Sequence, residues 1–434
     1  MGRNCVVFDA SLELVYSALV RALPPQPSWR AQTIAIEDPG PLEAYLPQTP
    51  ALAWLRRGDG MIGLGEAARL VGSDWATADA WWREFVDGLE IETELPGVGG
   101  PMVFASFPFD SGNTASPSVL VVPQVVIGRR RGQAWVTTIG PSVTRLDPPS
   151  RAGDRIEPPL VSGVTGRSLD RQQWQRIVAE AVERIESNGL SKVVLARGVE
   201  LTTESPIDPR WLIGALADRY PNCWTYCVDD LVGASPEMLV RLEGGLAMSR
   251  VLAGTIRRTG AEELDLKLAH SLARSSKNLI EHELAVESVA AALAPFCSGM
   301  NVPDAPYVLE LPNVLHLASD VTAVAHGDVS ALRLAAELHP SAAVCGTPTD
   351  TARRTIAELE QLDRGRYSGP VGWMDASGDG EFAIALRCGQ LAEDHRSITL
   401  YAGCGIVAES DPAEEYAETE AKLVPMLEAL RVAH

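Results

Sequence analysis

The chain has 434 residues, 46% of them hydrophobic, and a formal net charge of −20. A chain of this length and apolar content can bury a large core, so we expect a globular fold rather than a disordered chain. The negative charge argues against binding to nucleic acid or to an anionic membrane surface, because both depend on clustered lysine and arginine side chains.

Two further features bear on the compartment. Residues 1–25 lack a basic start followed by a sustained apolar stretch, and no segment reaches the roughly 18 uninterrupted apolar residues that spanning a bilayer requires. The seven cysteines are odd in number and scattered, so they predict buried thiols rather than a disulfide framework. We therefore expect a cytoplasmic protein without a membrane span.

The first 140 residues mix helices and strands and carry no obvious chemistry. Apolar spacing predicts helices at residues 12–23 and 75–89, and strand-like runs lie at 102–107, 119–127 and 133–138. A following stretch rich in Pro, Gly, Ser and Arg, at 141–167, is predicted to be an exposed connection.

The second half opens with a predicted helix at 170–187 and a strand at 192–196. The other strands that we expect lie at residues 224–228, 238–242, 246–252, 383–386 and 398–402. The other helices lie at 265–270, 278–294, 331–338, 353–362 and 412–430. Because the strands come in adjacent groups separated by helices, the pattern predicts antiparallel sheets with helices packed outside them.

Three strand ends and turns in this half carry residues suited to chemistry. Lys192 opens an apolar strand on the same face as Val194, and it is either an edge-strand lysine that blunts aggregation or a base held in a cleft. Glu237 follows a Ser-Pro turn and is either an exposed turn carboxylate or a functional acid. Gly254 and Thr255 end a strand, where a glycine lets a ligand approach the backbone, and a plain turn explains them equally well.

Two helices add further carboxylates. Glu281 shares a helix face with apolar residues, so its charge requires a partner, which is either a lysine or arginine or a divalent cation. An aspartate followed by proline at 411–412 is a strong helix start, and Glu415, Glu418 and Lys422 then stand on one face of that helix. Glu418 and Lys422 are either an ordinary surface ion pair or part of a site.

Taken in this order, these segments resemble the family of chorismate-using enzymes, which includes isochorismate, salicylate, anthranilate and aminodeoxychorismate synthases. The resemblance covers residues 165–434 and is supported by matching segments at 313–317, 338–346, 366–369 and 385–387. It implies an α/β (α+β) fold of two similar halves, with large packed antiparallel sheets, outer helices and a deep cleft. Residues 1–160 are then a variable N-terminal part and 165–434 the chorismate-binding catalytic region of one structural unit.

The resemblance implies a magnesium-dependent reaction in which water adds to C2 of chorismate and the C4 hydroxyl leaves, giving isochorismate. Water-using members of the family carry lysine where anthranilate-type members, which use ammonia, carry glutamine, so Lys192 implies water as the nucleophile. Lys192 would deprotonate that water as the catalytic base. Glu237, on the opposite face of the ring, would protonate the departing hydroxyl as the catalytic acid.

The same resemblance implies a metal site and a substrate site. Mg²⁺ would be held by Glu281 and Glu418, with Glu415 reaching it through a water, in the all-oxygen ligation that this ion prefers. Asn278 stands where some relatives carry an acid, so the surroundings of the metal are expected to differ. The substrate-binding residues implied are Gly254, Thr255, His316, Tyr367, Arg387, Gly405 and Lys422.

Several alternatives stay open. A salicylate synthase, which goes on to eliminate pyruvate from isochorismate, would share nearly the whole site, although segment 252–258 resembles isochorismate synthases more closely. An ammonia-using synthase subunit is disfavoured by Lys192, so we expect no obligatory glutaminase partner. A non-catalytic binding protein on the same fold would have lost these ionisable residues. The product of an isochorismate synthase feeds menaquinone or catechol siderophore biosynthesis, and either pathway is implied.

Overall fold

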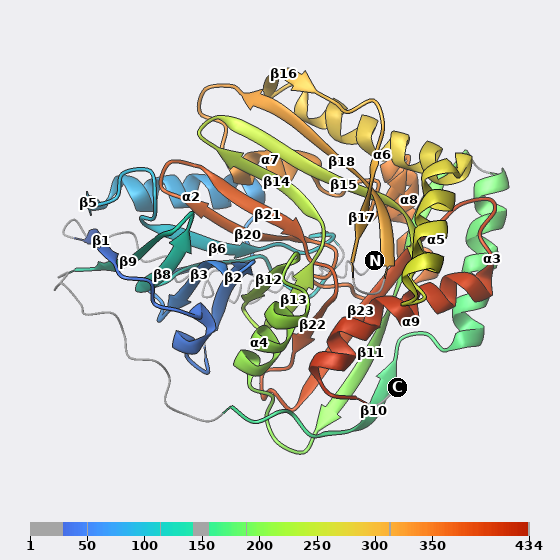
Figure 1. The fold of residues 1–434 in the computed structure, drawn as a ribbon, viewed down its shortest axis with the longest axis horizontal. Helices are drawn as coiled ribbons and strands as arrows, with labels where there is room; N and C mark the ends of the chain where they lie inside the picture. The colour runs from blue at the N-terminus through green and yellow to red at the C-terminus, as the bar shows by residue number, and fades with distance from the viewer. Residues whose placement is uncertain are drawn as a thin grey trace, which may run out of the picture.

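The computed structural model describes residues 29–49, 51–112, 114–141, 156–187, 189–311 and 314–432, without the side chains of residues 277 and 281. The helix expected at 12–23 lies outside the described residues. Within them, the chain forms two large β-sheets that pack face to face, with helices on their outer faces (Figure 1).

The larger sheet contains 13 of the described strands, and its pairings are antiparallel except that β5 runs parallel to β1. In spatial order it consists of β10 (Val161–Arg167), β11 (Lys192–Thr203), β23 (Ser397–Ile406), β22 (Cys388–Leu391), β13 (Leu231–Ser235), β12 (Trp224–Val228), β2 (Leu52–Arg56), β3 (Asp59–Leu64), β8 (Val125–Arg130), β9 (Gln133–Gly140), β1 (Arg30–Ile36) and β5 (Glu90–Thr93), with β19 (Gly346–Thr347) beside β11.

The smaller sheet contains 10 of the described strands and is antiparallel throughout. In spatial order it consists of β16 (Cys297–Asn301), β18 (Val314–Ala325), β15 (Leu246–Arg257), β14 (Met238–Glu243), β21 (Gly380–Ile384), β20 (Pro370–Asp375), β6 (Met102–Ser106), β7 (Val119–Val122) and β4 (Ala68–Val71), with β17 (Tyr307–Glu310) beside β18.

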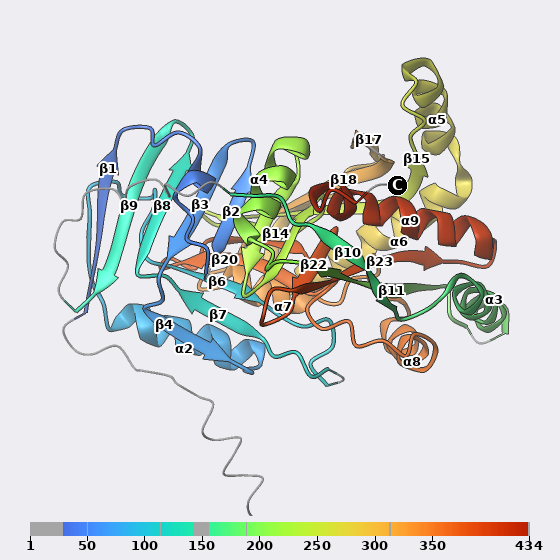
Figure 2. The same cartoon turned by 90° about the horizontal axis from the view of Figure 1, so that it is seen from below.

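Helices cover the outer faces of both sheets. They are η1 (Leu42–Tyr45), α2 (Trp75–Asp87), α3 (Arg171–Ser187), α4 (Pro209–Arg219), α5 (Glu262–Arg274), α6 (Ser276–Leu293), α7 (Ala331–Leu338), α8 (Thr349–Leu359) and α9 (Pro412–Ala429). α4 and α9 pack on the larger sheet, and α6 and α7 pack on the smaller one. α3, α8 and α9 gather at one end of the molecule, and α5 projects from its body (Figure 2).

An aromatic core fills the space between the sheets. Trp54 and Tyr226 from the larger sheet belong to the same buried cluster as Phe104 and Trp373 from the smaller one. Because side chains alternate along a strand, the opposite faces supply two further apolar clusters that pack under the helices. This arrangement confirms the expected fold class of large packed antiparallel sheets with outer helices.

The chain crosses between the two sheets at positions that matter for the site. It passes from the larger to the smaller sheet between β13 and β14, and from the smaller to the larger sheet between β21 and β22. Another crossing lies at Pro123, so the single strand expected at 119–127 is wrong. Proline has no N–H to donate to a ladder, and β7 and β8 on its two sides pair in different sheets.

The exposed connection expected at 141–167 is wrong at its end. Val161–Arg167 is β10, which pairs antiparallel with β11 despite its two glycines. Its pairing contains two register shifts, as is common at the edge of a sheet. None of the helices in the described part of the chain combines the length and apolar character needed to cross a bilayer.

Candidate active site

A cavity of about 350 Å³ lies where β11, β15, β23 and α9 meet. It brings together residues that are up to 230 positions apart in the chain, from Lys192 to Lys422. The residues expected from the sequence that line it are Lys192, Glu237, Gly254, Thr255, His316, Tyr367, Arg387, Gly405, Glu415, Glu418 and Lys422. Glu281 lies in α6, but its side chain is outside the described part of the structure. The roles assigned to these residues stay predictions.

Lys192 is the first residue of β11 and is buried, with 6% of its surface exposed. Lys192 and Val194 both line the cavity, whereas Val193 and Leu195 lie in the core on the other face, as strand alternation predicts. β11 pairs with β23 on one side and with β10 and β19 on the other, so Lys192 does not lie on an edge strand. The edge-strand interpretation of this lysine is therefore wrong.

Glu237 sits at the crossing from β13 to β14 and is buried. Its backbone is fixed on both sides, since its N–H donates to Ser235 Oγ at 3.2 Å and its carbonyl accepts from Ile384 N at 3.1 Å. Burial raises the pKa of Glu237 to about 7, although the positive charges of Lys192 and Arg387 act to lower it. The carboxyl therefore holds its proton in a substantial fraction of molecules at neutral pH, which suits a proton donor.

Arg387 and Lys422 supply positive charge to the cavity. Arg387 is buried and lies at the crossing from β21 to β22, with a left-handed backbone at φ 49°. Lys422 Nζ donates to Gly403 O at 2.8 Å and pairs with Glu418 at 2.6 Å. Burial alone would lower the pKa of Lys422, but the carboxylate of Glu418 raises it above the usual value. Lys422 is therefore cationic, and together with the guanidinium of Arg387 it suits a ligand with carboxylate groups.

A bulge in β15 forms another wall. Gly254 has φ 79°, and the pairing of β15 with β18 shifts register there. Thr255 Oγ1 is 2.9 Å from His316 Nδ1, and His316 Nε2 has no hydrogen-bond partner among the described residues. Burial, with the charges of Arg387 and Lys422, lowers the pKa of His316 well below its usual value, so the imidazole is neutral. A neutral ring with one unpaired buried nitrogen is suited to a hydrogen bond with a ligand.

α9 begins as the sequence predicts, because Asp411 Oδ1 accepts from Ala413 N at 2.9 Å and from Glu414 N at 3.0 Å. Glu415 and Glu418, one turn apart, both line the cavity. Burial and the negative charge of Glu418 raise the pKa of Glu415. A cation between these carboxylates would relieve that repulsion, and carboxylate oxygens are the ligands that Mg²⁺ prefers.

The magnesium site itself stays a prediction. Among the residues that the structure describes, no group of three or more His, Cys, Asp or Glu side chains is arranged to hold a metal ion. The third expected ligand is Glu281, whose side chain is outside that description. Asn278 of the same helix lines the cavity, one turn away from Glu281.

Tyr367 closes the cavity beside β23. Its ring stacks on Tyr401 with centroids 5.1 Å apart, and a side chain at Gly403 would come within 3.2 Å of its hydroxyl. The next residue, Ser368, also lines the cavity with a left-handed backbone at φ 63°. Sequence reasoning did not select Ser368, although it lies within the segment 366–369 that carries the family resemblance.

A buried ion pair that the sequence did not reveal supports β11. Glu360 and Arg364 lie four residues apart and are almost fully buried. Glu360 Oε1 accepts from Ala196 N at 2.7 Å, and Arg364 donates to Val194 O at 2.7 Å. The pair thus supplies hydrogen bonds along the stretch of β11 between its ladders with β19 and β10. From the sequence alone, a Glu and an Arg at this spacing are typical of an exposed helix pair.

Comparisons of the sequence with known proteins find a family model and several similar proteins. A family model described as chorismate binding enzyme matches residues 47–431. The chain is 40% identical over 275 residues to isochorismate synthase DhbC of Bacillus subtilis (strain 168), which covers 61% of this chain and 69% of that protein. It is 32% identical over 355 residues to isochorismate synthase EntC of Escherichia coli (strain K12), which covers 80% of this chain and 86% of that protein.

Solved structures with a similar fold include an isochorismate synthase. MenF, the menaquinone-specific isochorismate synthase of Escherichia coli, matches with a TM-score of 0.76 at 25% identity, over 96% of this chain and 98% of that one. The family model alone spans most of the chain, including the strands on both sides of the cavity. This chain therefore belongs to the family of chorismate-binding enzymes.

Proposed function

We propose that this chain is an isochorismate synthase, which adds water to C2 of chorismate and releases the C4 hydroxyl. The observation that carries the proposal is the pairing, in one cavity, of a buried lysine, Lys192, with a buried carboxyl, Glu237, whose pKa is about 7. The names of two relatives and of one solved structure support the same reaction.

The proton balance of the reaction gives one proton transfer to each of these residues. Lys192 takes a proton from water as the water oxygen bonds to C2 and the ring double bonds shift. Glu237 gives its proton to the C4 oxygen as the C4–O bond breaks, so a water molecule leaves. One water enters and one departs, and the product is an isomer of the substrate. Because burial raises the pKa of Glu237 to about 7, a substantial fraction of the molecules carries the proton needed for this step.

The remaining residues bind and orient the substrate. Arg387 and Lys422 bind its carboxylates, and His316, held by Thr255, offers Nε2 to a ring substituent. Glu418, Glu415 and Glu281 would hold a magnesium ion, which supplies positive charge for a carboxylate when it is bound. Two cationic side chains and a metal ion allow a protein of net charge −20 to bind a dianionic substrate.

Incubation of the purified protein with chorismate and Mg²⁺ tests the proposal. We expect isochorismate as the product, identified by chromatography, and a loss of turnover of at least about 100-fold in Lys192→Ala and in Glu237→Gln. Lys267→Ala and Glu263→Gln, which remove an exposed lysine and its exposed partner on α5, should retain full turnover. Formation of fluorescent salicylate with pyruvate would instead establish a salicylate synthase. Anthranilate formed only with ammonium would establish the ammonia-using branch.

The metal is tested separately. Removal of divalent ions with a chelator should abolish turnover, and Mg²⁺ should restore it. Glu418→Gln should weaken Mg²⁺ binding measured by calorimetry about tenfold or more, because it removes a charged ligand. Glu409→Gln, at an exposed position just before α9, is the matched control. Turnover that survives the chelator would overturn the magnesium assignment while leaving the acid and base assignments standing.

A further inference from the structure

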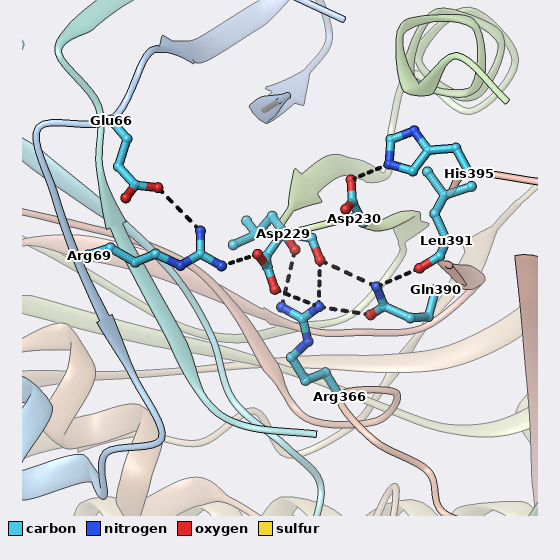
Figure 3. Close-up of polar contacts among 9 residues, drawn as sticks. Glu66, Arg69, Asp229, Asp230, Arg366, Gln390, Leu391 and His395 are labelled. Atoms are coloured by element: carbon cyan, nitrogen blue, oxygen red, sulfur yellow. Dashed lines mark hydrogen bonds and ion pairs between the residues drawn. The ribbon is translucent and has the colours of Figure 1, made fainter. Parts of the chain in front are cut away.

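A charged network outside the cavity surrounds the turn between β12 and β13 (Figure 3). Asp229 occupies this turn with a left-handed backbone at φ 50°. Its carboxylate pairs with Arg69 of β4 through one oxygen and with Arg366 through the other, at 3.2 Å. Arg69 also pairs with Glu66 at 3.3 Å, so two positive charges meet two negative ones.

Arg366 is the most buried member of this network, with 5% of its side chain exposed. Its guanidinium donates to Gln390 Oε1 at 2.9 Å, to Val228 O at 3.4 Å and to the carbonyl of Asp229. Gln390 is itself fixed, since its Nε2 donates to the carbonyls of Asp229 at 3.3 Å and Leu391 at 3.2 Å. A buried guanidinium with this many acceptors has one defined position rather than several.

The position of Arg366 in the chain connects this network to the cavity. The two residues that follow it, Tyr367 and Ser368, line the cavity while the side chain of Arg366 lies among residues of the β12–β13 turn and β22. Ser368 has a left-handed backbone, which a non-glycine residue adopts only at a cost of about 1 kcal/mol. Gly369 N donates to Arg366 O at 3.1 Å, so residues 366–369 form a hydrogen-bonded turn that begins at the arginine.

We infer that Arg366 is a positioning residue, which holds Tyr367 and Ser368 against the substrate through its bonds to Asp229 and Gln390. This inference rests on the proposed function, because it assigns Arg366 to that same site. Arg69 also pairs with the carboxylate of Asp229, but it belongs to β4 rather than to the turn at residues 366–369. The two arginines that pair with this carboxylate therefore have different roles.

This difference supplies a matched pair of variants. Arg366→Met removes the hydrogen bonds and the ion pair that the Arg366 side chain makes to Val228, Asp229 and Gln390. Arg69→Met removes a charge from the same carboxylate and leaves those bonds in place. In Arg366→Met, Asp229 keeps Arg69 as its partner, so no carboxylate is left without a counter-ion. Gln390→Leu removes one acceptor of Arg366 and is the milder variant if Arg366→Met does not fold.

Hydrogen exchange gives a readout that does not depend on turnover. We expect the amides of residues 366–369 to exchange at least about tenfold faster in Arg366→Met, and in the same direction in Gln390→Leu, because the turn loses its anchor. Arg69→Met should leave exchange in this segment within about twofold of the wild type. Equal exchange in all the variants would overturn the inference.

A kinetic double-mutant cycle separates positioning from general destabilisation. Arg366→Met and Tyr367→Phe should each lower kcat/KM about tenfold, and the double variant should lose little more than either single one, because Arg366 acts through Tyr367. Arg366→Lys should restore part of the loss, and Arg69→Met should stay within about twofold. If the fold losses of the two single variants multiply in the double variant, Arg366 acts independently of Tyr367, and this result would overturn the inference. A wild-type protein that makes no isochorismate would overturn the proposed function, while the exchange experiment still decides the role of Arg366.

Discussion

The carboxyl group of Glu237 is almost completely removed from water, and this burial acts on the stability of the fold as well as on reactivity. In the unfolded chain the group ionises near its usual pKa of 4.5, whereas in the folded protein it ionises at about 7. Between these values the folded protein retains a proton that the unfolded chain has released. The free energy of unfolding therefore falls as the pH rises from about 4.5 to 7, by up to about 3 kcal/mol from this group.

Glu237→Gln should accordingly be more stable than the wild type at pH 8, with a smaller difference at pH 5, because a glutamine never ionises. Denaturant unfolding at both pH values measures this difference, with the exposed Glu263→Gln as the control. In parallel, kcat/KM of the wild type should fall as the pH rises above about 7, where Glu237, the proposed proton donor, is ionised. A stability difference that is the same at pH 5 and pH 8 would contradict the assignment.

At the residue scale, the sequence revealed the charged residues of the site better than their supports. Lys192, Glu237 and Lys422 stand out because an ionisable side chain next to an apolar run requires an explanation. Glu360 and Arg364 do not stand out, because their spacing is equally typical of solvent-exposed helices. Their burial depends on the course of β11, which no local pattern reports.

At the scale of single elements, the bulge in β15 is the clearest case in which the backbone conformation requires a glycine, Gly254. A Cβ atom at Gly254 would meet Cβ of Asn278 in α6 at 3.1 Å, so this glycine sets how closely α6 approaches the strand. Gly245, in the hairpin between β14 and β15, has a similar left-handed backbone at φ 83° but no atom within 4 Å of an added Cβ.

We expect Gly245→Ala to lower the free energy of unfolding by about 1 kcal/mol, since only backbone strain is added. Gly254→Ala should cost more, because α6 must also move, and it should weaken chorismate binding since Gly254 lines the cavity. Urea unfolding and a substrate titration measure the two effects. Equal losses at the two glycines would show that the approach of α6 does not depend on Gly254.

The Glu360–Arg364 pair belongs to the same scale, because it completes the hydrogen bonding of one strand. Glu360→Gln leaves Arg364 buried without a counter-ion, and we expect a loss of about 3 kcal/mol or more in the free energy of unfolding. Glu263→Gln, which breaks the exposed pair with Lys267, should cost no more than about 0.5 kcal/mol. A loss as small at Glu360 as at Glu263 would show that β11 does not depend on the buried pair.

The elements found from the sequence are those with a sustained apolar period or a strong cap. α7 and α9 were placed within a residue of their observed bounds for this reason. β18 was missed, although it has 12 residues, because His316 and Asp320 interrupt its apolar pattern. His316 and Asp320 bind Thr255 and Arg250 of the neighbouring strand β15, and the sequence of β18 alone cannot indicate these partners.

At the scale of the whole molecule, both sheets continue across the boundary expected near residue 160. β12 pairs with β2, and β20 pairs with β6, so each sheet is built from strands on both sides of that boundary. The aromatic core between the sheets is likewise shared, since Trp54 and Phe104 pack in one cluster with Tyr226 and Trp373.

A fragment of residues 161–434 should therefore fail to unfold cooperatively, because two strand edges and the aromatic core lose their partners. Co-expression with residues 1–160 should restore a soluble, active complex if the two parts form one structural unit. Circular dichroism during urea unfolding, with the intact chain as the reference, provides the measurement. A cooperative transition in the isolated fragment would instead show two independent domains.

The crossings at Glu237 and Arg387 have a consequence for how the activity could be tuned from a distance. Lys192 is fixed to one sheet and His316 to the other, whereas Glu237 and Arg387 sit on the links between them. A displacement of one sheet relative to the other would change the distance between Lys192 and Glu237, the base and the acid proposed above. Substitutions of aromatic residues between the sheets, such as Trp54 or Trp373, would then alter turnover without contacting the substrate, because they change how the two sheets are placed relative to each other.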